Sequence, residues 1–191
     1  MKKILLLLLS LAILLCVVSC GKTGDVPAGF KLASDAELCD YTLYVPEAWV
    51  SESNRPDYTA ATVSNADTCS ISVAKLENVY EPTMAEYWNR CKTEYTFLQN
   101  FTVLPGGTDE NGVPVEWAKA TVGTGESARE GYRYVFTGDY NGVSYKYQQI
   151  FLVKNGVFGS DLYCITCTTT ADHYDNHLDA FNLILSYFAF R

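Results

Sequence analysis

The sequence is poor in basic residues. It contains 14 Lys and Arg against 22 Asp and Glu, which gives a formal net charge of −8. A surface of this sign repels phosphate backbones and anionic headgroups, so the composition argues against nucleic acid as a partner and against a domain that lies flat on a membrane. The acidic residues are scattered along the chain, which is typical of a solvated surface rather than of a dedicated cation-binding face.

The chain also lacks an apolar run long enough to span a membrane as a helix. The run from Ile4 to Val18 has 15 residues. At a rise of 1.5 Å per residue it covers about 22 Å, which is shorter than the roughly 30 Å hydrocarbon core of a bilayer. Because it is short and follows Lys2 and Lys3, the run is typical of an export signal.

The end of this run indicates lipidation. The stretch Val17-Val18-Ser19-Cys20-Gly21 resembles the bacterial lipobox, which implies a diacylglyceryl thioether on Cys20 and cleavage just before it. Residues 1–19 are then a lipoprotein signal peptide, and residues 20–29 are a lipidated tether. The alternatives are a plain secretory signal cut near Ser19 and an uncleaved anchor. We expect palmitate-type acyl chains to hold the protein at the cell membrane, on the extracytoplasmic side.

Seven cysteines are present, and two of them belong to the leader region. Cys16 follows Leu15, where a lipobox needs a small residue, so Cys20 is the expected lipid attachment site. The remaining five are Cys39, Cys69, Cys91, Cys164 and Cys167. Export favours disulfides, but these positions fall in apolar patterns that suit buried thiols equally well. The sequence therefore leaves both states open and identifies no pair.

Three Asn-Gly dipeptides, at 111–112, 141–142 and 155–156, each lie between alternating apolar runs. Asn-Gly fits the two positive φ angles of a type I′ hairpin turn, so the three predict an antiparallel meander. The predicted strands are Phe101–Asp109, Val113–Val122, Arg129–Tyr140, Val143–Lys154 and Val157–Thr169, with Gly123–Ser127 as a loop.

Treating the last two dipeptides as two-residue loops also predicts a register. Phe136 then lies opposite Tyr147, Tyr132 opposite Phe151, and Tyr147 opposite Cys164.

Residues 30–191 contain three further predicted strands and two predicted helices. The strands are Tyr41–Val45, Tyr58–Ser64 and Cys69–Leu76. Apolar residues at three- and four-residue steps follow Pro82-Thr83, namely Met84, Tyr87, Trp88, Cys91, Tyr95 and Leu98. The second helix is predicted after Asp172 from apolar residues at the same steps, namely Tyr174, His177, Leu178, Phe181, Leu185 and Phe188. The predicted class is therefore α+β, an antiparallel sheet covered by helices.

The predicted register places apolar residues on both faces of the sheet. One face collects Tyr132, Tyr134, Phe136, Tyr145, Tyr147, Phe151, Leu162 and Cys164. The other carries Val135, Ile150, Leu152, Tyr163, Ile165 and Cys167. Either helices cover both faces, or one aromatic face stays partly open as a binding surface. Cross-strand aromatic pairs ordinarily stabilise sheets, which favours core.

Two residue spacings resemble those of metal or redox sites, but the residues around them do not fit such sites. Cys164 and Cys167 have a C-x-x-C spacing, but residues three apart on a strand point to opposite faces, so a shared metal or a redox pair is disfavoured. His173 and His177 suit two metal ligands, but Tyr174 stands where H-E-x-x-H has glutamate, so a solvated helix flank is favoured.

The remaining motifs are incomplete. Ser127 lies in a segment where Arg129 replaces the glycine of a nucleophile elbow, and Pro105-Gly106-Gly107 lacks the lysine of a phosphate loop. The sequence therefore predicts a protein that is not an enzyme and has no cofactor or metal site.

Several segments together are similar to the PsbP-like family. They are the opening strand Tyr41–Trp49 with its Pro-x-x-Trp end, the Cys69–Leu76 strand, the helix with Tyr87 and Trp88, and the closing helix Asp172–Phe188. The family is named for an extrinsic protein of the photosynthetic oxygen-evolving complex and includes small bacterial lipoproteins. The resemblance covers most of residues 30–191.

The resemblance implies an α/β/α sandwich, with Trp49 as a core anchor, and a non-enzymatic accessory or binding role. No motif matches the metal ligands of the photosynthetic members.

We thus expect a membrane-tethered extracytoplasmic lipoprotein that acts as a non-catalytic binding or accessory domain. Its partner would be an envelope protein or a small ligand. One alternative is a small envelope hydrolase with dispersed carboxylates, which requires a pocket with convergent acids of shifted pKa. The other is a structural envelope-stress protein without a ligand.

Overall fold

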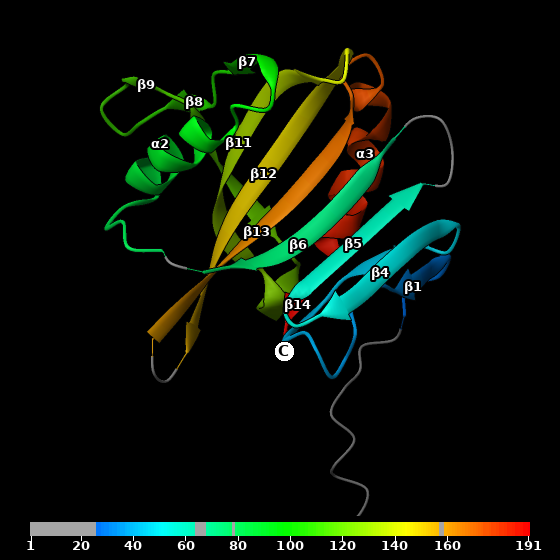
Figure 1. Ribbon diagram of the computed structural model, residues 1–191. Helices are drawn as coiled ribbons and strands as arrows, with labels where there is room; N and C mark the ends of the chain where they lie inside the picture. Colours follow the sequence, from blue (N-terminus) through cyan, green and yellow to red (C-terminus); the bar gives the residue numbers. More distant parts are fainter. Residues whose placement is uncertain (1–25, 64–67, 78, 157–158) are drawn as a thin grey trace, which may run out of the picture.

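The computed structural model describes residues 26–63, 68–77, 79–156 and 159–191. The signal peptide, Cys20 and the tether up to residue 25 lie outside the described residues, so the predictions made for them rest on the sequence alone. The part of the chain described here contains two α-helices and a large antiparallel sheet (Figure 1).

The main sheet has eight strands in the order β10-β11-β12-β13-β6-β5-β4, with β7 also paired to β11. Their bounds are β4 Trp49–Arg55, β5 Tyr58–Val63, β6 Ser70–Leu76, β7 Gln99–Val103, β10 Trp117–Val122, β11 Arg129–Tyr140, β12 Val143–Gly156 and β13 Gly159–Thr170. Three small two-stranded ladders accompany it, β1–β3, β2–β14 and β8–β9. Their strands are β1 Phe30–Leu32, β2 Tyr41–Thr42, β3 Tyr44–Pro46, β8 Gly107–Thr108, β9 Pro114–Val115 and β14 Ala189–Phe190.

The β11–β12 hairpin has the predicted turn and register. Asn141 and Gly142 have φ angles of +52° and +78°, and Tyr140 pairs with Val143 across them. Phe136 lies opposite Tyr147 and Tyr132 opposite Phe151, so both predicted pairs are confirmed.

The register predicted for the next hairpin is wrong. Asn155 and Gly156 belong to β12, where they pair with Ser160 and Gly159, and Tyr147 lies opposite Thr168 rather than Cys164. The ladder runs through the Asn-Gly dipeptide because continued pairing satisfies more backbone groups than an early turn would. The partner of Tyr147 moves by four positions, and because four is even, every side chain keeps its predicted face.

The start of the predicted meander is also different. Asn111-Gly112 closes only the short β8–β9 hairpin, where the Asp109 carboxylate accepts hydrogen bonds from the amides of Asn111 and Val113, both at 2.9 Å. Strands β7 and β10 each pair with β11, along different halves of its outer edge, instead of following one another in the sheet. A Cβ on Gly106 would lie 2.2 Å from the Trp117 carbonyl carbon, so glycine is required where the chain passes β10.

The N-terminal third differs in two further respects. Strand β4 was not predicted, because its segment Val-Ser-Glu-Ser-Asn-Arg after Trp49 has low β-propensity and holds its place by pairing with β5. The predicted strand Tyr41–Val45 is split into β2 and β3, which pair with β14 and β1 outside the main sheet. Trp49 is buried, so its prediction as a core residue is confirmed.

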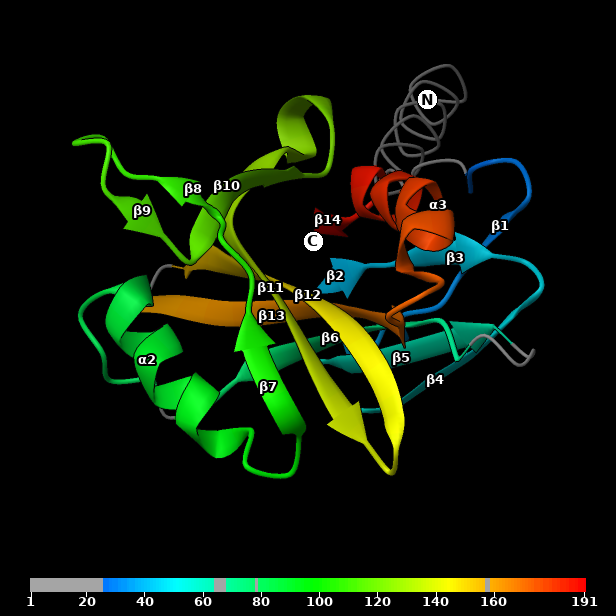
Figure 2. The same cartoon turned by 90° about the horizontal axis from the view of Figure 1, so that it is seen from above.

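Both predicted helices are present, as α2 (Met84–Glu94) and α3 (Tyr174–Ser186), but each ends earlier than predicted, so that Tyr95 and Leu98 follow α2 and Phe188 follows α3. Thr83 caps α2, because its hydroxyl accepts a hydrogen bond from the Glu86 amide at 3.2 Å and donates one to the Glu86 carboxylate at 2.7 Å. Neither helix of the described chain has the length and apolar composition that crossing a membrane would require. Figure 2 shows α2 and α3 on opposite sides of the sheet.

Each face of the sheet carries its own hydrophobic cluster. The α3-side cluster contains Ile150, Leu152, Tyr163, Ile165 and Cys167 of the sheet with Phe181, Ile184 and Leu185 of α3, and includes Tyr41, Leu43 and Phe188. The α2-side cluster contains Tyr134, Phe136, Phe151, Leu162 and Cys164 with Tyr87, Trp88 and Cys91 of α2. The α+β class is confirmed. The two faces are covered unequally, since α3 shares its face with N- and C-terminal segments, whereas among the described residues α2 is the helix that covers the other face.

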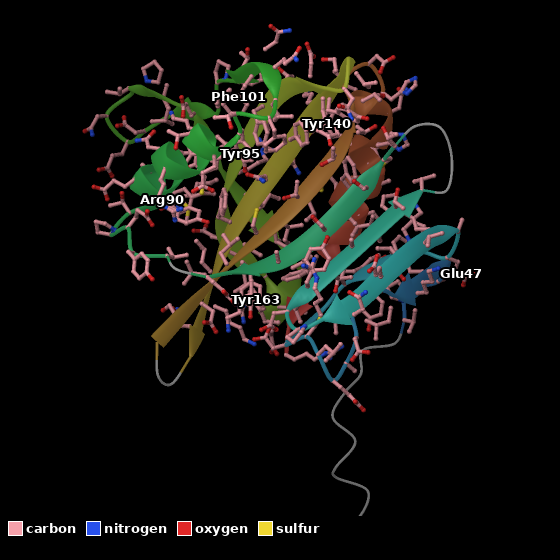
Figure 3. The ribbon with its side chains drawn as sticks, viewed as in Figure 1. Glu47, Arg90, Tyr95, Phe101, Tyr140 and Tyr163 are labelled. Carbon is pink, nitrogen blue, oxygen red and sulfur yellow. The ribbon has the colours of Figure 1, made fainter. Side chains whose placement is uncertain are left out.

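A polar cluster around Asp40 ties three distant segments together. The Tyr163 hydroxyl donates to one Asp40 carboxylate oxygen at 2.8 Å, the Lys154 ammonium bonds the other, and the Arg191 amide donates to the Asp40 carbonyl at 2.7 Å. Tyr163 is labelled in Figure 3. Partial burial pushes the pKa of Asp40 up, but the hydrogen bonds from Lys154 and Tyr163 outweigh it, and the pKa is lowered.

This cluster predicts a pH dependence of folding stability. The lowered folded-state pKa means that Asp40 contributes stability that is fully present above its unfolded value of about 3.9 and is lost as the pH falls through the folded value. Because the carboxylate is partly exposed, Asp40→Asn should cost on the order of 1 kcal/mol at pH 7. Urea unfolding between pH 7 and pH 3 should show that the variant loses less stability than the wild type on acidification. Parallel pH profiles would rule out this role.

Candidate functional site

An open groove lies between the start of α2 and the neighbouring end of the sheet. Its volume is about 940 Å³, which is within the range of ligand-binding sites. The apolar lining consists of Leu76, Val79, Pro82, Met84, Tyr87, Tyr132, Val153 and Leu162. The polar rim consists of Lys75, Glu77, Glu81, Thr83, Ser160 and Asp161.

The groove exists because α2 covers only part of its sheet face. Alternate residues of β12 point toward α2. The Phe151 ring packs edge-on against the Tyr87 ring, with the two centroids 5.6 Å apart, and Phe151 is 3% exposed. Val153, two residues further along the strand, is 46% exposed. An 11-residue helix is about 16 Å long and a 14-residue strand about 47 Å, so α2 cannot cover the full length of β12.

Ion pairs hold the charged residues of the rim. The Arg90 guanidinium bonds the Glu81 carboxylate and lies 5.0 Å over the Tyr87 ring, and the hydrogen bond from Arg90 lowers the pKa of Glu81. Figure 3 labels Arg90 on α2. Lys75 lies 2.9 Å from Asp161, a hydrogen bond that raises the pKa of Lys75. Arg90 balances Glu81 and Lys75 balances Asp161, so Glu77 leaves the rim with one net negative charge.

Aromatic residues continue from the groove along β11. The Tyr132 ring, which lines the groove, meets the Trp117 ring edge-on at 5.1 Å, and the Lys119 ammonium lies 5.0 Å over it. The next residue on the same face is Tyr134, which is buried against Trp88 with ring centroids 4.3 Å apart. The predicted aromatic face is thus core at Tyr134 and a lining surface at Tyr132.

The C-x-x-C pair has the geometry predicted for a strand. Cys164 belongs to the α2-side cluster and Cys167 to the α3-side cluster, so their side chains point to opposite faces and cannot share a metal ion. Burial raises the pKa of Cys164 to about 12, and burial also raises the pKa of Cys167. Both are therefore protonated, weakly reactive thiols at neutral pH. None of the five cysteines of the described chain is in a disulfide bond, and all five are buried.

The two histidines lie at the start of α3, away from the groove. His173 is the residue before the helix, and its Nδ1 lies 3.2 Å from the Thr170 hydroxyl. Within the described ranges, no three His, Cys, Asp or Glu side chains are grouped so that they could hold a metal ion.

Ser127 and the groove carboxylate of Glu81 are both engaged in local hydrogen bonds. The Ser127 hydroxyl donates to the Thr124 carbonyl at 2.7 Å and so stabilises a turn. A hydrolase of the kind considered above needs an acid whose pKa is raised. Glu81, the groove carboxylate in a close ion pair, has its pKa shifted in the opposite direction by Arg90.

Comparison with known proteins identifies the fold. No protein-family model and no curated protein sequence matches the chain. Among solved structures, LpqN of Mycobacterium tuberculosis, described as involved in cell envelope biogenesis, has a TM-score of 0.56 at 17% identity and covers 84% of this chain and 89% of its own.

Two further structures match at a TM-score of 0.50. The cyanobacterial PsbP of Synechocystis sp. PCC 6803 is 14% identical and covers 92% of this chain and 99% of its own. The Ran-binding protein Mog1p of Saccharomyces cerevisiae is 13% identical and covers 82% of this chain and 90% of its own. The chain therefore has a PsbP-like fold, as its sequence predicted.

Proposed function

We propose that this chain is a lipid-tethered extracytoplasmic protein whose PsbP-like α/β/α sandwich is a non-catalytic binding or accessory domain. The observation that carries the proposal is the groove beside α2, where an apolar sheet face continues past the helix that covers it. Structures of this fold include one described as involved in cell envelope biogenesis and one described as a Ran-binding protein. A shared fold is weak support for function, so the groove and the leader carry the argument.

The lining of the groove defines the chemistry of its ligand. An apolar floor gains most from burying an apolar segment, and the acidic rim favours a positive charge at its edge. Arg90 and Lys75 are already paired with carboxylates, which leaves little attraction for an anionic ligand. The fitting partner is an apolar peptide segment or small amphipathic molecule that carries a basic group, supplied by an envelope protein or as a free ligand.

Two valines on one strand provide a matched test of the groove. Val153 lines the groove and is 46% exposed, and Val143 lies on the same face at the other end of β12 and is 42% exposed. Val153→Arg places a cation on the apolar floor, where it repels a basic ligand and fills the space. It should weaken capture of envelope proteins or ligands by the soluble chain, residues 21–191, by at least about tenfold, or about 1.4 kcal/mol. Val143→Arg should bind as the wild type does.

The comparison uses titrated pull-down from envelope extracts, with circular dichroism to establish that both variants are folded. Equal binding by the two arginine variants would show that the groove is not the binding site. No reproducible partner or ligand for the wild type would contradict the proposal itself.

The proposed anchor is tested by metabolic labelling. Cells that express the full chain should incorporate a palmitate analogue into the wild type and into Cys16→Ala, because only Cys20 matches the lipobox. Cys20→Ala should take up no label and leave the membrane fraction. Incorporation of label into the Cys20→Ala protein would show that Cys20 is not the lipid attachment site.

A further inference from the structure

An exposed apolar patch lies where the end of α3 meets β1. Leu183 and Tyr187 are four residues apart and share one face at the end of the helix, and both are exposed. Phe30 and Leu32 share one face of β1, where Leu32 is exposed and Phe30 is half-buried against the α3-side cluster. The Phe30 and Tyr187 rings join the two elements edge-on, with centroids 5.3 Å apart. We call these four residues the anchor-side patch.

The patch lies beside the point where the described chain begins. Val26 is the first described residue, and the Phe30 amide donates to the Pro27 carbonyl at 3.0 Å, so a single turn connects this start to β1. Six residue steps separate Cys20 from Val26. A fully extended chain of that length reaches about 21 Å. If Cys20 carries acyl chains, the anchor-side patch stays close to the lipid headgroups.

The charges of α3 favour contact through its C-terminal end. The exposed residues of its first turns include Asp175 and Asp179, and its last turn has no basic residue. Asp175 lies about 18 Å along the helix from Tyr187, so the apolar end can touch a membrane while the acidic end stays in water. The net negative charge of the chain disfavours a domain lying flat, but this contact involves one apolar corner.

We propose that the anchor-side patch rests on the lipid bilayer and orients the domain. The proposal rests on the lipid anchor of the proposed function. The acyl chains hold the protein at the membrane and give the patch a high local concentration there, so even a weak apolar contact sets the orientation. Figure 2 shows β1 and α3, which carry the patch, on one side of the sheet and α2, beside which the groove lies, on the other. The groove consequently lies on the sheet face opposite to the one that carries the patch, where soluble or envelope partners can reach it.

Spin labels at two matched positions test this orientation. Leu183 is 45% exposed in the patch, and Val143 is 42% exposed on the opposite face of the sheet. Each is replaced by cysteine in the full-length acylated protein, in which the five described native cysteines are buried and protected from the label. In phosphatidylcholine vesicles, the Leu183→Cys label should collide several-fold more with oxygen, relative to a water-soluble nickel chelate, than the Val143→Cys label does. Leu32→Cys, from the β1 half of the patch, should match Leu183→Cys.

The controls separate the patch from the anchor. Mass spectrometry of the same samples determines whether Cys20 is acylated. Equal oxygen-to-nickel ratios at positions 183, 32 and 143 in acylated, vesicle-bound protein would overturn the orientation and leave the anchor standing. An unacylated Cys20 would overturn both. In Cys20→Ala protein without vesicles, the labels at 183 and 143 should be equally accessible to nickel.

Discussion

The structure depends on one constraint, which is that strands β11 to β13 are apolar on both faces. On β12, Ile150 and Leu152 point to one side and Tyr147 and Phe151 to the other. Each face must be removed from water, because burial of apolar surface is the main favourable contribution to folding. The two helices, the terminal segments and the loops that connect them are arranged around that requirement.

The two faces meet this requirement in different ways. On the α3 side, the helix, the segment with Tyr41 and Leu43 and the closing residue Phe188 together bury the apolar centre of the sheet face. The cluster of Asp40, Lys154 and Tyr163 fixes these segments at the edge with directional polar contacts. On the α2 side, a short helix covers Phe136 and Phe151 but does not reach Val153. The asymmetry makes one face a structural core and the other a core that continues into a groove.

The sequence predicted the features that depend on neighbouring residues. Asn141-Gly142 specified a turn because both positions need positive φ, and Thr83 specified a helix start because its hydroxyl caps the Glu86 amide. Strand alternation placed Cys164 and Cys167 on opposite faces. The predictions that were wrong concern features that depend on pairing with residues distant in the sequence. Asn155-Gly156 has the same turn chemistry as Asn141-Gly142 but lies within a ladder, and β4 is a strand because β5 lies beside it.

The groove could not be predicted from the sequence, because it results from the length of α2 relative to β12 and from the position at which the helix crosses the sheet. The predicted aromatic face already included Tyr132, but nothing local distinguishes it from buried Tyr134. The central claim is that one sheet face passes from covered to open within two residues.

Solvent paramagnetic relaxation along β12 tests that claim most directly. With a soluble gadolinium chelate added to the domain, NMR should show strong relaxation of the Val143 and Val153 methyl groups and weak relaxation of the Phe151 ring. A Val153 side chain as well protected as Phe151 would contradict the account.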